Sequence, residues 1–165
     1  MHYLLTFTCY GQHLHGHESG SVDLGHHLYG GDFIETSLRY ELLDSKLMRD
    51  KPYTLGPDER EIVLASIVNV CACCKWDLLA AHVRSTHVHV IVGSELAPEL
   101  VMNRLKAYAS RALNDRDAVE RGRKRWTRHG STRWLFDDEA IGAAFRYVVE
   151  EQGEPMAVYR QDRVG

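Results

Sequence analysis

The hydrophobic and polar positions along the chain predict four strands. Residues 3–10 are rich in aromatic and β-branched side chains, which is typical of a strand. Residues 76–84 and 86–93 share this character and are separated only by Ser85, so together they predict a β-hairpin. A shorter strand is predicted near residues 133–136.

Three helices are predicted around these strands. The first begins at Pro57, because proline suits a first helical turn and the acidic residues that follow suit the positive end of the helix dipole. The second spans residues 98–114. The third begins after Asp137 and Asp138, which can cap it, and runs to about Gln152.

One face of the second helix carries apolar and small residues at helical spacing: Val101, Leu105, Tyr108, Ala109 and Ala112. Tyr108 lies close to the centre of this stripe, so we expect a core residue there. A further short helix is compatible with residues 37–48.

The order of these elements is β-α-β-β-α-β-α, which predicts an α+β fold. It corresponds to a ferredoxin-like or RRM-like antiparallel sheet with helices on one face and an additional C-terminal helix. Residues 11–36 are rich in Gly and His without helical periodicity and predict a loop insertion. Without an internal repeat or a linker, residues 1–165 are expected to form a single domain.

Composition excludes several classes of protein. The chain is 44% hydrophobic and 26% charged, which is near the average for soluble globular proteins and argues against disorder. The absence of a long apolar run and of a signal-like start disfavours membrane and secreted proteins. The four cysteines have neither zinc-site nor disulfide spacing and are expected to be free thiols, which suits a cytoplasmic location: Cys9, Cys71, Cys73 and Cys74.

The net charge of −3 conceals a strong asymmetry. Residues 104–133 hold ten Lys and Arg against three acidic residues, a net charge of +7, and the rest of the chain is acidic. A basic block inside an acidic protein is typical of a site for a polyanion, although a solvated loop paired with acidic neighbours has the same charge.

A histidine pair is the most specific chemical feature of the sequence. His87 and His89 lie two residues apart in a predicted strand, so both side chains point to one face and the intervening valines to the other. Two imidazoles at this spacing can hold one metal ion, and we prefer this interpretation to two ordinary strand histidines. The open positions of such an ion suit Mg²⁺ or Mn²⁺ with an oxygen ligand and a substrate phosphate.

The last helix can complete that site. Tyr147 lies off the centre of its apolar face and shares a flanking face with Glu151, four residues on. A tyrosine phenol can act as a covalent nucleophile toward a polarised electrophile. Spacing alone is weak support, because an exposed helical tyrosine usually has no catalytic role.

These residues resemble a known family. The strand HVHVIV resembles the His-hydrophobe-His motif of HUH single-strand nucleases, and RYVVEEQGEP resembles the tyrosine helix of single-tyrosine transposases. The segments MNRLKAYASRALN and RWTRHGSTRWLF are similar to parts of REP-associated tyrosine transposases. The resemblance covers about residues 57–155, with residues 3–10 as the first strand, and extends to single-strand transposases of insertion sequences.

The resemblance implies a metal-dependent transposase that cleaves and rejoins single-stranded or hairpin DNA through a 5′-phosphotyrosine. Tyr147 would be the nucleophile, and His87 and His89 would hold the Mg²⁺ or Mn²⁺. The family ligand four residues after the tyrosine is usually Gln or Asn, whereas this chain has Glu151 there and Gln152 next. We favour Glu151. The resemblance leaves open whether the tyrosine helix serves its own chain or the partner in a homodimer.

The basic block then has a role in binding DNA, because cations that alternate with tryptophans suit phosphates and stacked bases. Trp134 is expected in the core, and Trp126 fits either environment. The candidate DNA-binding residues are Arg104, Lys106, Arg111, Arg121, Arg123, Lys124, Arg125, Trp126, Arg128 and Arg133.

Two other functions compete with this prediction. The first is a catalytically inactive, RRM-like nucleic-acid-binding regulator derived from a transposase. The second is a metal-handling protein that uses Cys71–Cys74 and a histidine-rich loop with His13, His15, His17, His26 and His27. We regard a native metal site in that loop as the weaker interpretation, because its glycines favour a solvated segment.

Overall fold

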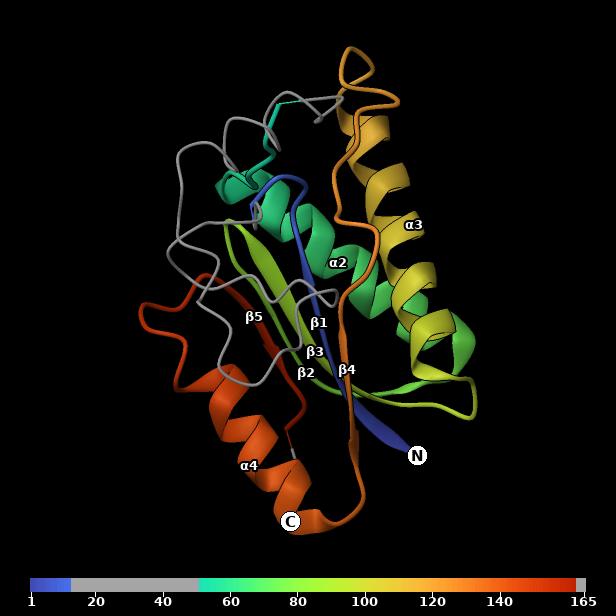
Figure 1. The fold of residues 1–165 in the computed structure, drawn as a ribbon, viewed down its shortest axis with the longest axis vertical. Coiled ribbons are helices and arrows are strands. Elements are labelled where there is room, and N and C mark those ends of the chain that lie inside the picture. The colour runs from blue at the N-terminus through green and yellow to red at the C-terminus, as the bar shows by residue number, and fades with distance from the viewer. Residues whose placement is uncertain (13–50, 163–165) are drawn as a thin grey trace, which may run out of the picture.

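The computed structural model describes residues 1–12 and 51–162, which form a mixed structure of one antiparallel sheet and three helices (Figure 1). The strand order is β4-β1-β3-β2-β5, so the first four strands have the predicted ferredoxin-like arrangement. The fifth strand was not predicted and pairs with β2 at one edge. The elements are β1 (His2–Thr8), α2 (Pro57–Cys74), β2 (Asp77–Val83), β3 (His87–Gly93), α3 (Pro98–Arg116), β4 (Ser131–Leu135), α4 (Asp138–Val149) and β5 (Ala157–Arg160).

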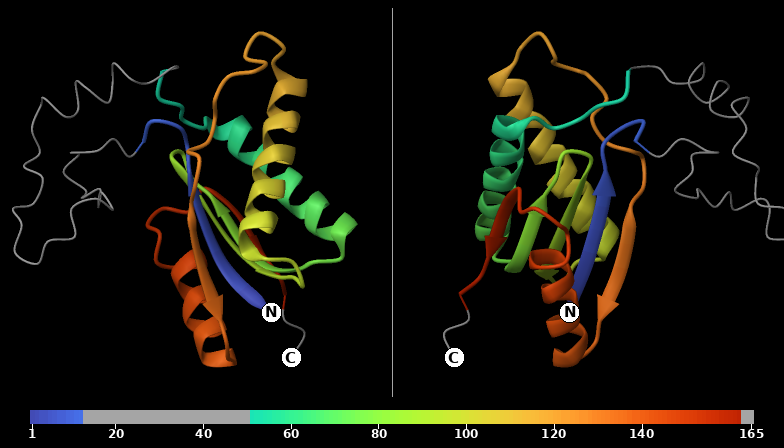
Figure 2. Two further views of the ribbon diagram at one scale, coloured as in Figure 1. Left: turned by 45° about the vertical axis from the view of Figure 1, so that its right-hand side comes forward. Right: turned by 90° about the vertical axis from the view of Figure 1, so that its left-hand side faces the viewer.

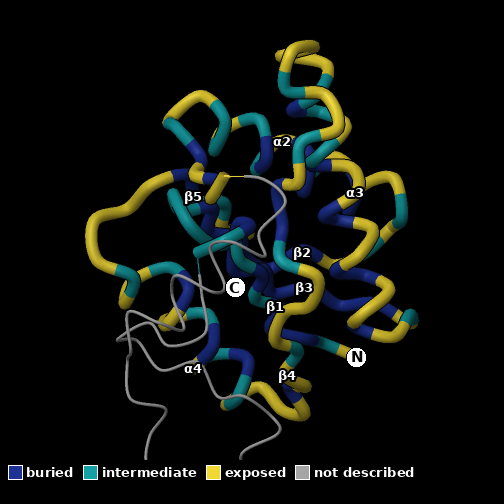
Figure 3. Tube along the Cα trace, turned by 45° about the horizontal axis from the view of Figure 1, so that its top comes forward, coloured by how far each residue is buried: buried dark blue, intermediate teal, exposed yellow. Residues whose placement is uncertain are grey.

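The helices cover both faces of the sheet. Figure 2 shows α2 and α3 on one side and α4 on the other. Strand alternation sends Tyr3, Leu5 and Phe7 into the larger core beneath α2 and α3. Leu4 and Ile91 point the opposite way, into a smaller core beneath α4. The central strands β1 and β3 are therefore buried on both faces (Figure 3).

The first helix begins where proline predicted it. Pro57 occupies its first turn, and the Glu59 carboxylate accepts a hydrogen bond from the Gly56 amide at 2.8 Å. The chain leaves this helix through Lys75, whose φ of 56° is left-handed. Here local sequence signals and the observed helix ends agree.

The second helix corrects the expectation for Tyr108, which is 45% exposed. The buried face follows Val101, Leu105, Ala109 and Leu113, together with the neighbouring position 102, and this turns position 108 to the edge. The guanidinium of Arg111 lies 5.0 Å from the centre of the tyrosine ring. The phenol is a surface group and not part of the core.

The last helix is shorter than predicted. Asp137 caps it by accepting a hydrogen bond from the Ala140 amide at 2.7 Å, as the sequence indicates. The helix ends at Val149 and not near Gln152. The chain turns through Gly153, which has a φ of 75°, and returns as β5 to pair with β2.

Some predictions lie outside the described residues. These are most of the loop insertion at 11–36, its histidines, and the short helix at 37–48. Among the helices that the structure describes, none has the length and apolarity needed to cross a membrane.

The four cysteines are free, as expected, and they differ in burial. Cys9 and Cys71 are buried, and burial raises the pKa of each thiol from 9.0 to about 12. Cys73 is exposed and Cys74 is half-buried.

We predict that a disulfide reagent at about pH 8 modifies Cys73 quickly and Cys74 more slowly, while the two buried thiols react only on unfolding. Absorbance at saturating reagent, before and after denaturant, measures this.

Substitution of Cys73 by Ser should remove the fast phase and leave the slow one. A fast phase of more than one thiol in that variant would contradict the burial of Cys9 and Cys71.

The raised pKa values of Cys9 and Cys71 also predict that the free energy of unfolding decreases as pH rises above about 9, because the folded protein retains protons that the unfolded thiols release.

Candidate functional site

The histidine pair lies on the face of the sheet that α4 covers. His87 and His89 alternate along β3 with Val88 and Val90, which are buried in the opposite core, so the two imidazoles share a face as predicted. Their ring centres are 4.8 Å apart. The strand alternation alone brings the two rings together.

Threonine hydroxyls orient both imidazoles. Thr6 Oγ1 lies 2.8 Å from Nδ1 of His89, and Thr86 Oγ1 lies 3.0 Å from Nδ1 of His87. Each ring therefore uses Nδ1 within the protein. A hydrogen bond to one ring nitrogen fixes the direction of the other, which is the usual support of a metal-binding histidine.

His89 is buried with one ring nitrogen unused. The side chain is 4% exposed, and Nε2 has no hydrogen-bond partner among the residues that the structure describes. The pKa of His89 is lowered to about 4: burial is the main cause, the nearby His87 also lowers it, and the Gln152 side chain acts in the opposite direction. A neutral imidazole with an unpaired nitrogen is the form in which histidine binds a metal ion.

Tyr147 approaches this pair from α4. Its side chain is 41% exposed, in agreement with a position off the centre of the apolar face, and its ring centre lies 5.4 Å from that of His89. The helix is held against the sheet by Ile141, Ala144 and Val148. A histidine pair and a tyrosine from distant segments of one chain thus meet at a single place.

Glu151 and Gln152, the two candidates for the third ligand, lie in different surroundings. The shared helical face that favours Glu151 is absent, because α4 ends at Val149 and Glu151 is exposed in the turn beyond it. In the described part of the chain, no three His, Cys, Asp or Glu side chains form a group that could hold a metal. Gln152 lies beside His89, and its Nε2 donates a hydrogen bond to the Tyr147 carbonyl at 3.0 Å.

His82 is a residue of this site that sequence reasoning missed. It is fully buried on β2 and pairs across the sheet with His89. Its Nδ1 lies 2.9 Å from the Val148 carbonyl, and its Nε2 accepts a hydrogen bond from the Met156 amide at 3.1 Å. One imidazole thus joins the end of α4 and the return of the chain to the sheet, on both sides of Gln152. The sequence did contain a signal for it, because the register of the β2–β3 hairpin places His82 directly opposite His89.

Three of the predicted DNA-binding side chains are buried and serve the fold. Lys106 Nζ donates to the carbonyls of Thr127 and His129, each at 2.9 Å. Arg125 donates to the Tyr53 hydroxyl at 2.6 Å, and Trp126 packs edge-on against Phe7 at 5.1 Å. These contacts correct the prediction for Lys106, Arg125 and Trp126, because they secure the long connection between α3 and β4 and leave little surface for DNA.

The other cations divide between two regions. Arg104 and Arg111 are exposed on α3, which covers the face away from the histidines. Arg123 is half-buried and pairs with Glu120 at 2.7 Å. The remaining members are exposed along the connection or on β4: Arg121, Lys124, Arg128 and Arg133.

Trp134 is also a correction, because it is 43% exposed and not a core residue. It lies on β4, which is an edge strand of the sheet among the described residues. Its ring meets Tyr3 edge-on at 4.8 Å and stacks nearly parallel to Phe136 at 6.3 Å.

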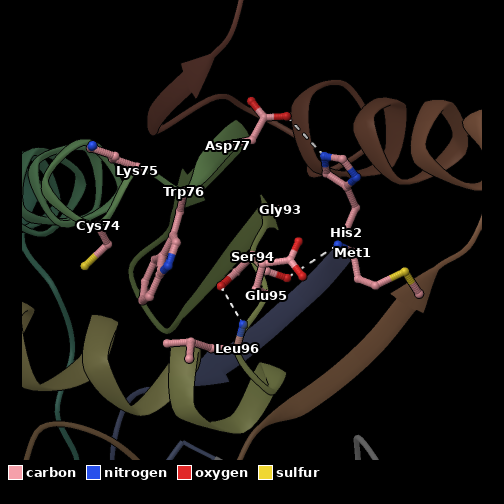
Figure 4. Close-up of a pocket in the computed structure, with 10 residues that line it drawn as sticks. All are labelled: Met1, His2, Cys74, Lys75, Trp76, Asp77, Gly93, Ser94, Glu95 and Leu96. Carbon is pink, nitrogen blue, oxygen red and sulfur yellow. Dashed lines mark hydrogen bonds and ion pairs between the residues drawn. The ribbon is translucent and has the colours of Figure 1, made fainter.

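A separate cavity of about 370 Å³ lies at the other end of the sheet (Figure 4). Its walls include Trp76, Cys74 and the pair formed by His2 and Asp77, whose Nε2 and Oδ2 atoms are 3.1 Å apart. It lies at the start of β1 and the end of β3, whereas the histidine pair lies at the opposite ends of these strands. None of the three converging side chains lines it, so this cavity is separate from the histidine site.

Comparisons with known proteins identify a family and a fold. A family model described as "Transposase IS200 like" matches residues 38–138, which include the histidine strand but neither β1 nor Tyr147. A solved structure of a REP-associated tyrosine transposase bound to a REP hairpin superposes with a TM-score of 0.50 and 9% identity. The match covers 90% of this chain and 64% of that one, and at this identity it shows a shared fold. No curated protein sequence matches the chain.

The two hydrogen bonds of His82 generate a prediction. We expect His82→Ala to lower the free energy of unfolding by about 2 kcal/mol, because it leaves a buried carbonyl and an amide unpaired. The amide of Met156 should exchange with solvent faster in the variant. Urea denaturation and hydrogen exchange measure the two effects, with the exposed His129→Ala as the control. Unchanged exchange at Met156 would show that His82 does not hold this segment.

Proposed function

The chain belongs to the IS200-like transposase family, and from this premise we propose that it cleaves and rejoins single-stranded DNA through a covalent bond between Tyr147 and a 5′-phosphate. The observation that carries the proposal is the convergence of Tyr147 with His87 and with His89, whose buried Nε2 is unpaired. The proposed partner is a single strand, including one that carries a hairpin.

The proposed reaction is a transesterification. The phenol oxygen of Tyr147 attacks the phosphorus, and the bond from phosphorus to the 3′ oxygen of the preceding nucleotide breaks. The phenolic proton passes to water, and the leaving oxygen takes up a proton to become a 3′ hydroxyl. Attack of a 3′ hydroxyl on the phosphotyrosine reverses these steps and rejoins the strands. No bond energy is lost to hydrolysis, so the same site can cleave and join.

We propose that His87, His89 and Gln152 hold a divalent cation, Mg²⁺ or Mn²⁺. The unpaired Nε2 of His89 and its lowered pKa fit this role, because the imidazole stays neutral at physiological pH. An imidazole pair with an amide oxygen favours Mn²⁺ of the two ions. When bound, the cation would neutralise and orient the scissile phosphate.

The chain's own residues prepare this site before DNA arrives. The threonine at position 6 holds the His89 ring, and His82 anchors the segment that carries Gln152. Because Tyr147 lies beside the histidines of its own chain, we propose that one chain completes the site without a second copy. This arrangement supports cleavage in cis.

We propose that the exposed cations bring the strand to this site. Arg121, Lys124 and Arg128 follow α3, and Arg133 lies on the face that α4 covers. The acidic remainder of the chain opposes binding elsewhere, so affinity for DNA should decrease steeply with salt concentration. Arg104 and Arg111 lie beneath the other face and are less suited to this role.

The nucleophile can be tested with a matched pair of exposed tyrosines. We expect wild type with Mn²⁺ to form a covalent adduct with single-stranded oligonucleotides that carry a hairpin and random flanks. Tyr147→Phe should abolish the adduct and Tyr108→Phe should leave it unchanged, because only the first phenol adjoins the histidines. A label at the 3′ end should remain with the protein on a denaturing gel, since the phosphotyrosine retains the downstream fragment.

A 5′ label on the adduct would reverse the proposed polarity. Tight binding of the same oligonucleotides without any adduct would instead favour the catalytically inactive regulator.

The third ligand can be tested by two neighbouring substitutions. We expect Gln152→Ala to weaken Mn²⁺ binding about tenfold and Glu151→Ala to change it less than about twofold. The reason is that Gln152 adjoins His89, whereas Glu151 is exposed in the turn after α4. Calorimetric titration of metal-free protein measures both constants. The opposite ranking would restore Glu151 as the ligand.

A further inference from the structure

A second feature lies beside the tyrosine, on the side away from the histidine strand. It is a cavity of about 330 Å³ between β1, β4 and α4. The strands contribute Leu4, Thr6, Ser131 and Arg133, and the helix contributes Ala143, Ala144 and Tyr147.

Strand register explains why these side chains meet. Thr6 pairs with Ser131 and Leu4 pairs with Arg133, so these four side chains share the face beneath α4. The alternate pairs, such as Tyr3 with Trp134, point to the other face. A displacement of β4 by one residue would turn Arg133 and Ser131 to the opposite face, so the cavity would lose its cation and one of its two hydroxyls.

The helix keeps this space open because its facing side chains are small. Positions 142–144 read Gly-Ala-Ala, so the cavity is bounded on this side by methyl groups and by the Tyr147 ring. Ala144 is buried in the smaller core, whereas Ala143 is exposed at the cavity wall. A larger side chain at position 143 would fill the cavity without disturbing the core.

The chemistry of the walls matches one nucleotide. Leu4 and Ala144 form an apolar surface for a base or sugar, two hydroxyls offer hydrogen bonds, and Arg133 offers a cation for a phosphate. Among the described residues that line the cavity, none is acidic. Its volume is at the lower end for ligand sites, which is too small for a base pair with its backbone.

The cavity is also connected to the reacting groups. Thr6 lines it and holds the His89 ring through Nδ1, and Tyr147 forms one wall. A nucleotide in this space would therefore lie next to a phosphate placed between Tyr147 and the histidines.

We propose that this cavity, the nucleotide pocket, holds the nucleotide that adjoins the scissile phosphate and thereby selects its base. Arg133 pairs with the phosphate of that nucleotide, and the two hydroxyls contact its polar edges. The proposal rests on the proposed function for the position of the scissile phosphate. The protein itself thus discriminates between bases at one position next to the cleaved bond.

Two substitutions test the nucleotide pocket, each with a control of the same kind. Ala143→Leu fills the pocket from an exposed helical position, and Ala107→Leu makes the same change on α3. Arg133→Ala removes the cation, and Arg160→Ala removes an equal charge from β5, at the opposite edge of the sheet. All four positions are exposed, so the variants should fold.

The first measurement needs no catalysis. Single-stranded hexanucleotides of random sequence are titrated into Tyr147→Phe protein and followed by amide chemical shifts. We expect shifts at Ser131 and Ala143, and an affinity about tenfold weaker after Ala143→Leu or Arg133→Ala but not after either control. Shifts confined to other surfaces, or equal effects of a substitution and its control, would overturn the proposal.

The second measurement uses the covalent adduct. Sequencing of the DNA bound to wild type should show a preference at one position next to the cleaved bond, and Ala143→Leu should remove it. Adducts with no such preference would overturn base selection. If wild type forms no adduct at all, the proposed function fails, and the hexanucleotide titration decides on the nucleotide pocket alone.

Discussion

The period of two in the central strands is the constraint on which the site depends. In β3 it sends three valines into the core beneath α2 and α3 and presents the two histidines to α4. Burial of each valine side chain stabilises the fold by roughly 2 kcal/mol, and this sets the register of the strand. A slip of one residue would bury the imidazoles in that core and turn the valines toward α4, so folding and positioning of the histidines are inseparable.

Burial beneath α4 gives the histidines their chemical character. A helix packed on this face removes water from His89 and keeps it neutral, while Thr6 occupies its other nitrogen. The same helix carries Tyr147, so a single packing interaction creates the dry environment and delivers the nucleophile. His82 closes this arrangement from the neighbouring strand by holding the end of the helix and the chain beyond it.

The parts of the fold that local patterns determine could be predicted from the sequence. Strand alternation placed His87 and His89 on one face, and helical periodicity placed Tyr147 beside the apolar stripe of α4. The third ligand could not be predicted by spacing, since it depends on where α4 stops. That end is set by the return of the chain to β2, which is a long-range contact.

Tertiary context likewise decided which members of the basic block are surface groups. Composition treats Arg125 and Arg133 alike, yet one is buried against Tyr53 and the other lines a cavity beside Tyr147. The difference arises because the connection after α3 folds back onto the helix and needs internal donors for its carbonyls, whereas β4 is an edge strand with one face beneath α4. The cations of this positive segment therefore have two roles: some complete the fold, and others remain at the surface, where they can attract a polyanion. Affinity for DNA should follow the second group alone, so the net charge of the segment overstates its capacity to bind phosphate.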